Sequence, residues 1–366
     1  MSKTVLVYSN HPDWTYNLRF EVLQGLIQRG HRVIIVVGYG KHIEDLKEIG
    51  CEHINVPYDR HGKNPFKEIK LFRTYKKILK EVAPDVVLSY TVKPNLYAAY
   101  LCRRNNIPCI ANITGLGTAV EYPGIMQKIL VYAYMICFKS IYKVFFQNTS
   151  NRDFFIEHRL VKDNYDLLPG SGVNIEKFTP LEYPSEETIE FVFISRIMKE
   201  KGIDQYLTAA KAIREKYPNT RFHVCGFCEP EYSGALEQSQ TSGDVIYHGM
   251  VDNVMDVLKK THCMVFPTYY PEGMSNVLLE NAACARPIIT TDRPGCREIV
   301  EDGYNGFICK AKDSDNLIST IERFMNLSYD EKKQMGKNAR MKVEKQFDRR
   351  IVVDKYIQVV ESVRND

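Results

Sequence analysis

The sequence lacks an apolar run long enough to span a lipid bilayer, which takes about 20 residues. Its longest apolar run has ten residues, from Ile129 to Phe138, and lies between Lys128 and Lys139. The start of the chain also lacks the apolar segment of an export signal, because Met1-Ser2-Lys3 leads directly into a strand-like segment at 4–8. We therefore expect a cytoplasmic protein without a membrane-spanning helix.

Clustered cysteines are also missing. The ten cysteines are scattered and lie mostly in apolar stretches, which is typical of buried free thiols in a reducing compartment. Only Cys225 and Cys228 are close neighbours, and neither a second cysteine pair nor a His-x-x-x-His accompanies them. We therefore expect neither a disulfide framework nor a zinc site.

Two kinds of binding motif are missing as well. No Gly-x-Gly-x-x-Gly follows the first strand-like segment of either half of the chain, which argues against a nicotinamide dehydrogenase. No DNA- or RNA-binding module is recognisable and the net charge is only +4. Nucleic acid is therefore not expected as a partner.

Positive charge is concentrated in the first half of the chain. Residues 1–180 contain 24 Lys and Arg against 16 Asp and Glu, whereas residues 181–366 contain 25 against 29. This surplus indicates an anionic partner or an anionic surface in the first half.

Strand-like and helix-like segments alternate along the chain. In the first half the strand-like segments lie at 4–8, 32–37, 53–56, 85–89, 108–112 and 143–147, with helices such as Asn17–Arg29 between them. The same alternation restarts at 189–195 and continues at 221–226, 245–248, 263–267, 287–290 and 306–309. Near-continuous apolar strands in this order predict an α/β fold with parallel sheets covered by helices on both faces.

The 366 residues suit two domains. A Pro- and Gly-containing segment at 168–174 and an acidic stretch after it separate the two series of strands. We predict one domain at 1–172 and a second at 173–349, with a helix at about 350–366 that returns to the first. A single larger α/β domain is the alternative.

A loop with two glutamates stands out in the second half. Pro271-Glu272-Gly273-Met274-Ser275-Asn276-Val277-Leu278-Leu279-Glu280 follows an apolar strand and leads into a helix. A strand, a glycine turn and a helix N-terminus together form an anion site. The carboxylates on either side of that site fit a ligand with both phosphate and hydroxyl groups, such as a nucleotide-sugar.

A second turn provides the matching cations. Arg196 and Lys201-Gly202 follow the first strand of this half, and we expect them to hold a diphosphate from the side opposite the Glu272 loop. The alternative is that Arg196 and Lys201 are ordinary solvated cations without a ligand.

Four motifs then follow one another at characteristic spacing: Arg196-x(4)-Lys201-Gly202, Glu272-x(7)-Glu280, Arg286-Pro287…Asp292 with Gly295-Cys-Arg-Glu298, and Asp302-Gly-Tyr-Asn-Gly306. With them, the whole chain resembles the retaining GT-B glycosyltransferases of family 4. The first half is similar to the branch that extends undecaprenyl-diphosphate-linked sugars. The residues behind this second likeness are Tyr16-x-x-Arg19, Thr91-x-Lys93-Pro94-Asn95 and Asn112-Ile-Thr-Gly115-Leu-Gly117.

The resemblance implies a fold and a reaction. The fold is GT-B, with two Rossmann-like domains facing across a cleft. The reaction moves a sugar, a hexose or an N-acetylhexosamine, from a UDP-sugar to a polyprenyl-diphosphate-linked saccharide. UDP-N-acetylgalactosamine is the donor that the branch favours. The enzyme would work at the inner face of the cell membrane.

The resemblance also implies roles for residues of the donor site. Arg196 and Lys201 would neutralise the departing diphosphate, and Glu272 would hold hydroxyls of the transferred sugar. Backbone N–H groups of the Gly273-Met274 turn and of Ser275-Asn276-Val277 would bind the phosphates. Glu280 would bind the ribose, and the loops Gly226-Phe227 and Gly249-Met250-Val251 would flank the base.

No metal or other cofactor is then required, because two cations and a helix N-terminus already stabilise the leaving group. Asp313-Ser-Asp315 has the spacing of a manganese site in other glycosyltransferase folds, but we interpret Asp313 as the cap of a helix starting near Ser314. Glu272 as a covalent nucleophile is an alternative. We favour front-face transfer, in which the departing phosphate takes the acceptor's proton.

The acceptor site is expected in the first half. The loop at 9–14 lacks the glycines that many family members have there, and the His-Asp pair often seen near 112–117 is absent. His11 is a candidate base, although a lone histidine is often structural. Lys93 and Arg19 are candidates for the acceptor phosphate, and the remaining acceptor residues would be Asp13, Thr114 and Gly115.

Two segments suggest an anionic membrane surface as a partner. A basic amphipathic segment contains Arg60, Lys63, Lys67, Lys70, Arg73, Lys76, Lys77 and Lys80. It fits either an anionic leaflet or a solvated helix face. The apolar run at 129–138, with Tyr132, Tyr134 and Tyr142 in or near it, is interpreted as a buried helix over the sheet. The alternative is a segment that dips into the membrane interface.

Two other functions remain open. A nucleotide-sugar 2-epimerase would share the fold and need no acceptor. A glycan- or lipid-binding protein without activity would need no intact set of Arg196, Lys201, Glu272 and Glu280.

Overall fold

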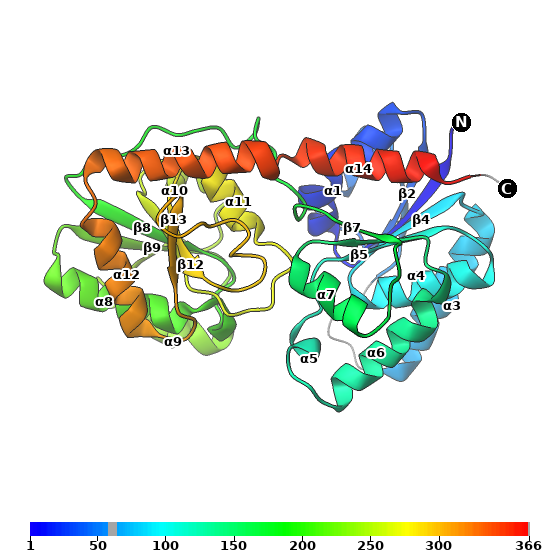
Figure 1. Cartoon of the computed structure of the whole chain (residues 1–366), viewed down its shortest axis with the longest axis horizontal. Coiled ribbons are helices and arrows are strands. Elements are labelled where there is room, and N and C mark those ends of the chain that lie inside the picture. Colours follow the sequence, from blue (N-terminus) through cyan, green and yellow to red (C-terminus); the bar gives the residue numbers. More distant parts are fainter. Residues whose placement is uncertain (58–63, 365–366) are drawn as a thin grey trace. The chain divides into compact units, whose positions relative to one another are not determined.

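The computed structural model describes residues 1–57 and 64–364. The chain forms two compact units (Figure 1). The first unit comprises Met1–Ser171 together with Arg349–Asp366, and the second unit is the continuous segment Gly172–Asp348.

The first unit is built on a parallel sheet with the strand order β3-β2-β1-β4-β5-β6-β7 among the described residues. Its strands are β1 (Thr4–Tyr8), β2 (Arg32–Val37), β3 (Glu52–Asn55), β4 (Val86–Tyr90), β5 (Cys109–Ile113), β6 (Lys143–Phe146) and β7 (Tyr165–Leu167). Every residue of β4 and β5 is buried, as expected for central strands that are covered on both faces.

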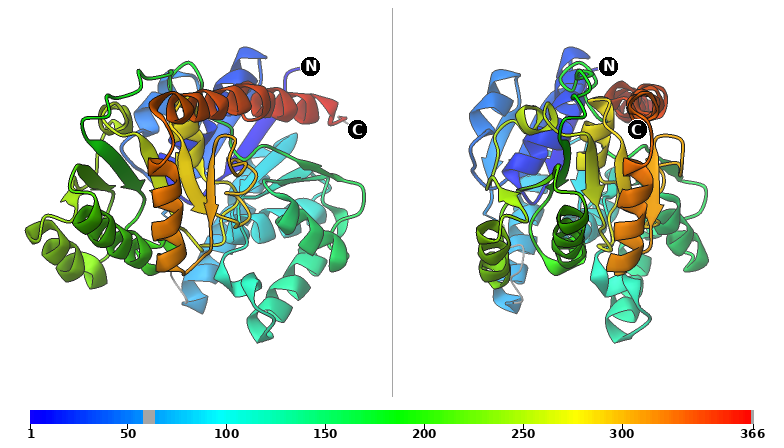
Figure 2. Two further views of the ribbon diagram at one scale, coloured as in Figure 1. Left: turned by 60° about the vertical axis from the view of Figure 1, so that its left-hand side comes forward. Right: turned by 90° about the vertical axis from the view of Figure 1, so that its left-hand side faces the viewer.

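Helices cover both faces of this sheet (Figures 1 and 2). One face packs against α1 (Pro12–Gln28), α2 (Ile43–Glu48) and α14 (Arg349–Ser362). The other packs against α3 (Pro65–Val82), α4 (Val92–Arg104), the short α5 (Thr118–Glu121), α6 (Ile125–Cys137) and α7 (Thr149–Glu157), with the turn η1 (Phe138–Ser140) after α6.

The last helix of the chain belongs to the first unit. Apolar residues of α14 complete the core between α1 and the sheet, and Gly25 leaves room for Val353, which lies 2.9 Å from where a Cβ would stand. Arg349 at its start donates to Glu21 at 2.7 Å. Tyr356 donates from its hydroxyl to Asn112 at the end of β5. The first unit is thus assembled from both ends of the described chain.

The second unit repeats the architecture. Its parallel sheet has the order β10-β9-β8-β11-β12-β13, which is the Rossmann order 3-2-1-4-5-6. The strands are β8 (Ile189–Ile194), β9 (Thr220–Cys225), β10 (Ile246–Tyr247), β11 (Cys263–Phe266), β12 (Ile288–Thr291) and β13 (Gly306–Cys309).

The helices of the second unit again lie on both faces of the sheet. α8 (Ile203–Lys216) packs against α12 (Ser314–Met325), and α11 (Asn276–Ala283) packs against α13 (Tyr329–Gln346). Figure 2 shows the two pairs on opposite faces. Shorter elements are η2 (Lys199–Lys201), η3 (Pro230–Tyr232), α9 (Ser233–Thr241) and α10 (Val254–Leu258).

Three expectations about local structure need correction. The edge strand β7 was not predicted, because its three residues are only partly buried and give no apolar run. Helix α1 begins at Pro12 and not at Asn17, since proline suits the first helical position. The predicted loop at 9–14 therefore ends at His11.

The third correction concerns α6, which was expected to be buried. Tyr134 is buried, but Ile129, Tyr132 and Met135 are 57%, 63% and 50% exposed. One side of the helix covers the sheet. The opposite side carries apolar residues where a surface helix usually carries polar ones. It presents an apolar face to solvent.

Candidate active site

The loops after β8 and β11 define a site in the second unit. These two strands are neighbours in the sheet, and the helices that follow them, α8 and α11, lie on opposite faces. Ligands of such sheets bind at this switch point, outside the carboxyl ends of the strands. The two predicted parts of the donor site follow these strands: Arg196 and Lys201 follow β8, and the Glu272 loop follows β11.

The Lys201 ammonium forms an ion pair with the Glu272 carboxylate. Both side chains are largely buried, at 13% and 17% exposure, and the ammonium also lies over the Tyr270 ring, 4.7 Å from its centroid. An ammonium has three N–H donors. Lys201 is therefore held by Glu272 through one of these donors.

Gly202 lets the Lys201 turn approach β11. The turn η2 ends at Gly202 with φ of 83°, a conformation that side chains rarely adopt. A Cβ at this position would stand 2.2 Å from the Pro267 carbonyl oxygen. Any larger residue would push Lys201 away from the Glu272 loop.

Arg196 has a partner that the sequence did not reveal. Its guanidinium lies 3.5 Å from Glu229, with side-chain exposures of 41% and 32%. Glu229 is brought there by the segment after β9, because Ile197 N–H donates to Phe227 O at 2.7 Å and Glu229 N–H donates to Ile197 O at 3.1 Å. The only signal in the sequence was an acid three residues after Gly226.

The N-terminus of α11 has a narrower role than the sequence suggested. Ser275 N–H donates to the Gly295 carbonyl at 2.9 Å, so this donor is already used inside the loop. The N–H groups of Asn276 and Val277, in the first turn of α11, have no acceptor within the helix. Phosphate binding by this helix would rest on the remaining N–H groups of its first turn, those of Asn276 and Val277 among them.

The other residues of the double-glutamate loop lie before and within α11. Gly273 and Met274 are buried between β11 and α11. Glu280 lies on α11 and is partly exposed, whereas its neighbours Leu279 and Asn281 are buried. The two glutamates are therefore carried by different elements, Glu272 by the loop and Glu280 by the helix.

The two loops predicted to flank the base are bonded to each other. Gly226 N–H donates to Gly249 O at 2.7 Å, and Tyr247 Oη donates to Gly226 O at 3.0 Å. Phe227 and Met250 are 55% and 73% exposed, while Val251 is partly buried. Two apolar side chains thus stand at the carboxyl ends of β9 and β10, as a planar base would require.

The cap predicted at Asp313 is present. Its carboxylate accepts from Asn316 N–H at 2.9 Å and caps α12. In the part of the chain that the structure describes, no group of three or more His, Cys, Asp or Glu side chains is placed to hold a metal ion.

A cavity of about 1170 Å³ opens in the first unit. It lies at the carboxyl ends of β1, β2 and β3 and along α3, and His11 and Asp13 both line it. His11 stands directly before α1 with its ring stacked on Trp14, 5.1 Å between centroids. The charged residues that line the cavity favour an anionic ligand: they are Lys41, Lys67 and Lys70 against Asp13 and Glu68.

The other predicted acceptor residues do not line this cavity themselves and are held by neighbouring residues. Lys93 donates to Glu68 at 2.7 Å. Arg19 is buried, stacks on the Tyr90 ring at 4.4 Å and donates to Ser171 at 3.1 Å. Thr114 and Gly115 follow β5 and are partly buried.

Two asparagines of the branch motifs are structural. Asn95 donates to the Asn112 carbonyl oxygen at 2.8 Å, and Asn112 donates from its side chain to Ser89 O at 2.9 Å. Both are buried. They fix α4 to β4 and β5.

The basic segment forms α3, whose start at Pro65 leaves Arg60 and Lys63 outside the described residues. Phe66 and Ile69 of α3 are exposed. Its exposed cations are Lys67, Lys70, Arg73, Lys76, Lys77 and Lys80. No helix among the described residues is long and apolar enough to cross a membrane.

Comparison with known proteins supports the class of the enzyme. The family model for glycosyl transferases group 1 matches residues 176–342, and the model for glycosyl transferase 4-like proteins matches residues 5–148. A cyanobacterial structure, Anabaena Alr3699/HepE in complex with UDP and glucose, superimposes with a TM-score of 0.80 at 15% identity, over 98% of this chain and 100% of that chain. The fold is GT-B, and the chain belongs to the family-4-like glycosyltransferases.

Two relatives are similar over most of their length. One is the N,N'-diacetylbacillosaminyl-diphospho-undecaprenol alpha-1,3-N-acetylgalactosaminyltransferase of Campylobacter jejuni, 25% identical over 95% of this chain and 96% of that protein. The other is the UDP-Gal:alpha-D-GlcNAc-diphosphoundecaprenol alpha-1,3-galactosyltransferase of Escherichia coli, 24% identical over 80% of each chain. Both bear out the predicted resemblance to enzymes of undecaprenyl-linked glycan assembly.

Proposed function

We propose that this glycosyltransferase moves a hexose or N-acetylhexosamine from a UDP-sugar to a polyprenyl-diphosphate-linked saccharide, with retention of the anomeric configuration. The observation that carries the proposal is the Lys201–Glu272 pair at the switch point of the second sheet, beside the N-terminus of α11. The similarity to the two undecaprenyl-linked transferases supports the acceptor class.

In this proposal the donor binds to the second unit. Lys201 and Arg196 face the diphosphate, and each keeps a carboxylate partner, Glu272 and Glu229. Charge accumulates on the diphosphate as the glycosidic bond breaks, and cations fixed in advance stabilise that charge better than mobile water does. No step requires a metal ion, because the leaving group is neutralised by side chains and backbone N–H groups.

Glu272 then has two tasks. Its bond to Lys201 orients the ammonium, and we assign the carboxylate to the hydroxyls of the transferred sugar, for which carboxylate oxygens are acceptors. We assign the acceptor's proton to the departing phosphate, so that transfer occurs on the face that the diphosphate leaves.

The acceptor is assigned to the cavity of the first unit. His11 and Asp13 line it, and three lysines give it a positive potential. Such a cavity favours the diphosphate and the polar sugar of a lipid-linked acceptor.

A direct test offers labelled UDP-sugars to the enzyme together with a short-chain polyprenyl-diphosphate-linked N-acetylhexosamine. We expect one UDP-sugar to give a lengthened product whose new anomeric configuration, measured by NMR, equals that of the donor. An inverted product would overturn the retaining mechanism. A new sugar epimer formed without acceptor would replace the proposal with a 2-epimerase, and absence of both products across the panel would favour a binding protein.

We also propose that the first unit binds peripherally to the anionic inner face of the cell membrane. Helices α3 and α6 cover the same face of the first sheet. α3 offers exposed cations with Phe66 and Ile69, and α6 offers its exposed apolar face. This combination suits binding to an anionic leaflet.

Cosedimentation with phosphatidylglycerol vesicles tests the membrane proposal. Ile129→Asp on α6 should weaken binding about tenfold, whereas Ile351→Asp on α14, an isoleucine that is also exposed, should leave it unchanged. Equal binding of the wild type to neutral vesicles would remove the role of α3, and equal binding of the two variants would remove that of α6.

A further inference from the structure

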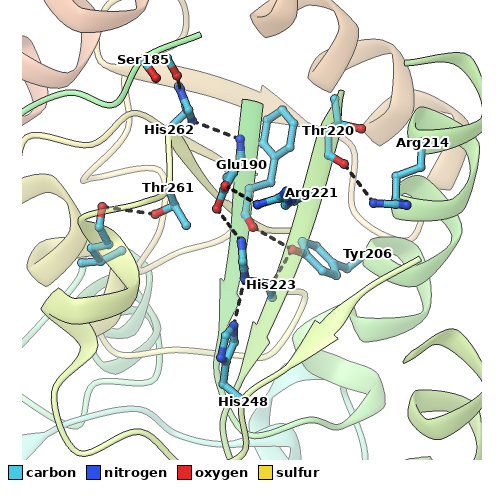
Figure 3. Close-up of polar contacts among 12 residues, drawn as sticks. Ser185, Glu190, Tyr206, Arg214, Thr220, Arg221, His223, His248, Thr261 and His262 are labelled. Atoms are coloured by element: carbon cyan, nitrogen blue, oxygen red, sulfur yellow. Dashed lines mark hydrogen bonds and ion pairs between the residues drawn. The ribbon is translucent and has the colours of Figure 1, made fainter. Parts of the chain in front are cut away.

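Two histidines and a glutamate form a hydrogen-bonded chain across three neighbouring strands of the second sheet (Figure 3). Glu190 lies on β8, His223 on β9, and His248 directly after β10. His223 Nε2 lies 2.8 Å from Glu190 Oε2, and His223 Nδ1 lies 2.9 Å from His248 Nε2. The two rings are nearly parallel, with centroids 5.1 Å apart.

The partners determine which nitrogens carry hydrogen at neutral pH. A carboxylate only accepts, so His223 carries its hydrogen on Nε2 and donates it to Glu190. His223 Nδ1 is then an acceptor, and His248 must donate from Nε2. Glu190 thus fixes the tautomer of His223, and His223 fixes the orientation of His248.

The chain of bonds ends at the loops that were assigned to the base. Tyr247 and Gly249, the two neighbours of His248, both bond Gly226. Gly226 has φ of 134°, and a Cβ there would stand 1.9 Å from Ser195 O. The Gly226 turn is thus pressed against the residue before Arg196, and any shift of His248 would move both loops.

We infer that His248, held by His223 and Glu190, is a positioning residue that keeps the Gly249–Val251 loop in place for the uracil ring of the donor. The inference rests on the proposed function, because it takes the UDP-sugar as the ligand. His248 need not touch the donor. Its effect passes through the backbone of Gly249 and through the bonded Gly226 turn.

Protons should weaken this support in a defined way. With one proton added, His223 donates from Nδ1 and His248 accepts, so the bond persists. With two protons added both nitrogens carry hydrogen and the bond breaks. The charged groups that face the pair are Glu190 on β8, Arg221 on β9 and Lys260 before β11.

Burial lowers the pKa of both histidines; Glu190 opposes the shift at His223, and Lys260 adds to it at His248. The doubly protonated state is therefore reached only below the ordinary histidine pKa of about 6.5. The loop support is intact above that pH and is lost as the pH falls through the lowered pKa values.

A control histidine bonds the backbone, not the carboxylate, of Glu190 at the amino end of β8. His262 is buried like His223, accepts at Nδ1 from Glu190 N–H at 3.0 Å, and lies 3.0 Å from Ser185 O through Nε2 (Figure 3). It stands at the amino end of β11, far along the strand from the carboxyl-end loops. His262→Asn should lower thermal stability without changing affinity for the nucleotide.

The test measures the affinity of the full chain for UDP by calorimetry, without any turnover. His248→Leu should weaken UDP binding about fivefold at pH 7.5, and the kinetic counterpart is a higher donor KM with kcat within twofold. His248→Gln, which retains a donor near the position of Nε2, should stay within twofold of the wild type. Glu190→Gln, which removes the fixed charge, should lie between the two.

The pH dependence gives a second readout. When the pH is lowered from 7.5 to 5.5, the UDP affinity of the wild type should fall to that of His248→Leu. The UDP affinity of His248→Gln should stay above that of His248→Leu by the same factor at both pH values. Titration of the UDP phosphate itself is common to all variants and cancels in these ratios.

The failures can be told apart. A wild type that does not bind UDP would sink the donor assignment and the inference with it. A wild type that binds UDP no better than His248→Leu at pH 7.5 would overturn the inference alone, and so would an equal loss of affinity in His262→Asn.

Discussion

The two units share the strand order 3-2-1-4-5-6, to which the first unit adds β7, but they use their polar side chains differently. In the second unit the cations follow the switch-point strands and meet carboxylates there, Lys201 with Glu272 and Arg196 with Glu229. In the first unit the predicted cations are tied into the scaffold, Arg19 on Tyr90 and Lys93 on Glu68. The diphosphate is the same chemical group in every UDP-sugar, so the same cations can bind it. An acceptor site must instead fit a particular glycan.

The largest effect is expected from breaking the clamp of the second unit. Lys201→Ala, Glu272→Ala and Arg196→Ala should each lower kcat/KM by roughly 10²-fold or more, because each removes stabilisation of the departing diphosphate or of its cation. Steady-state assays with the identified UDP-sugar measure this. Near-normal turnover in all three variants would refute the site assignment.

The first unit should respond more weakly. Lys93→Ala should raise the KM for the lipid-linked acceptor about tenfold, if Lys93 leaves Glu68 to bind the acceptor phosphate. Glu68→Gln is the control, because it removes the same ion pair and keeps the cation. A purely structural Lys93 would instead give both variants the same loss of thermal stability and an unchanged acceptor KM.

A smaller effect is expected at Asp313. Asp313→Ala removes the cap of α12 and should cost about 1 kcal/mol of stability, or a few degrees of Tm in thermal unfolding. Activity should stay near normal in that variant and also in the wild type with EDTA. The metal interpretation of Asp313-Ser-Asp315 would be restored if activity strictly required a divalent metal and was lost in Asp313→Ala.

Acid should affect the second unit more than the first. Burial is the main cause that lowers the pKa of His223, His248 and His262 in the second unit, and the same holds for His31 in the first. A lowered histidine pKa stabilises the fold above the unfolded value of about 6.5, and this contribution disappears as the pH falls through the folded value. Hydrogen exchange at pH 7.5 and 5.5 should show the greater loss of protection in residues 172–348.

The sequence was a good guide wherever one residue pattern had one physical solution. Buried parallel strands need continuous apolar runs, so β8 and β11 were predicted within one residue of their observed bounds. The placement of Lys201 and Glu272 at one site was predictable because both residues follow switch-point strands. The Asp313 cap was predictable because its hydrogen bond is local.

Contacts between segments that are distant in the sequence could not be predicted in this way. Glu229 meets Arg196 only because two loops pair after their strands, and the Ser275 N–H is taken by Gly295 from a separate loop. The apolar pattern of α6 is compatible with a buried helix and with an exposed apolar face alike. Nothing local to the sequence decides which side of such a helix is covered.

The return of α14 to the first unit has a consequence for synthesis on the ribosome. The second unit is one continuous segment and has its whole core once residue 348 has been made. The first unit still lacks the side chains that fill the space beside α1, such as Val352 and Tyr356, although most of it was translated earlier. Its α1 face must wait, exposed, until the last helix emerges, so the part made first is the part finished last.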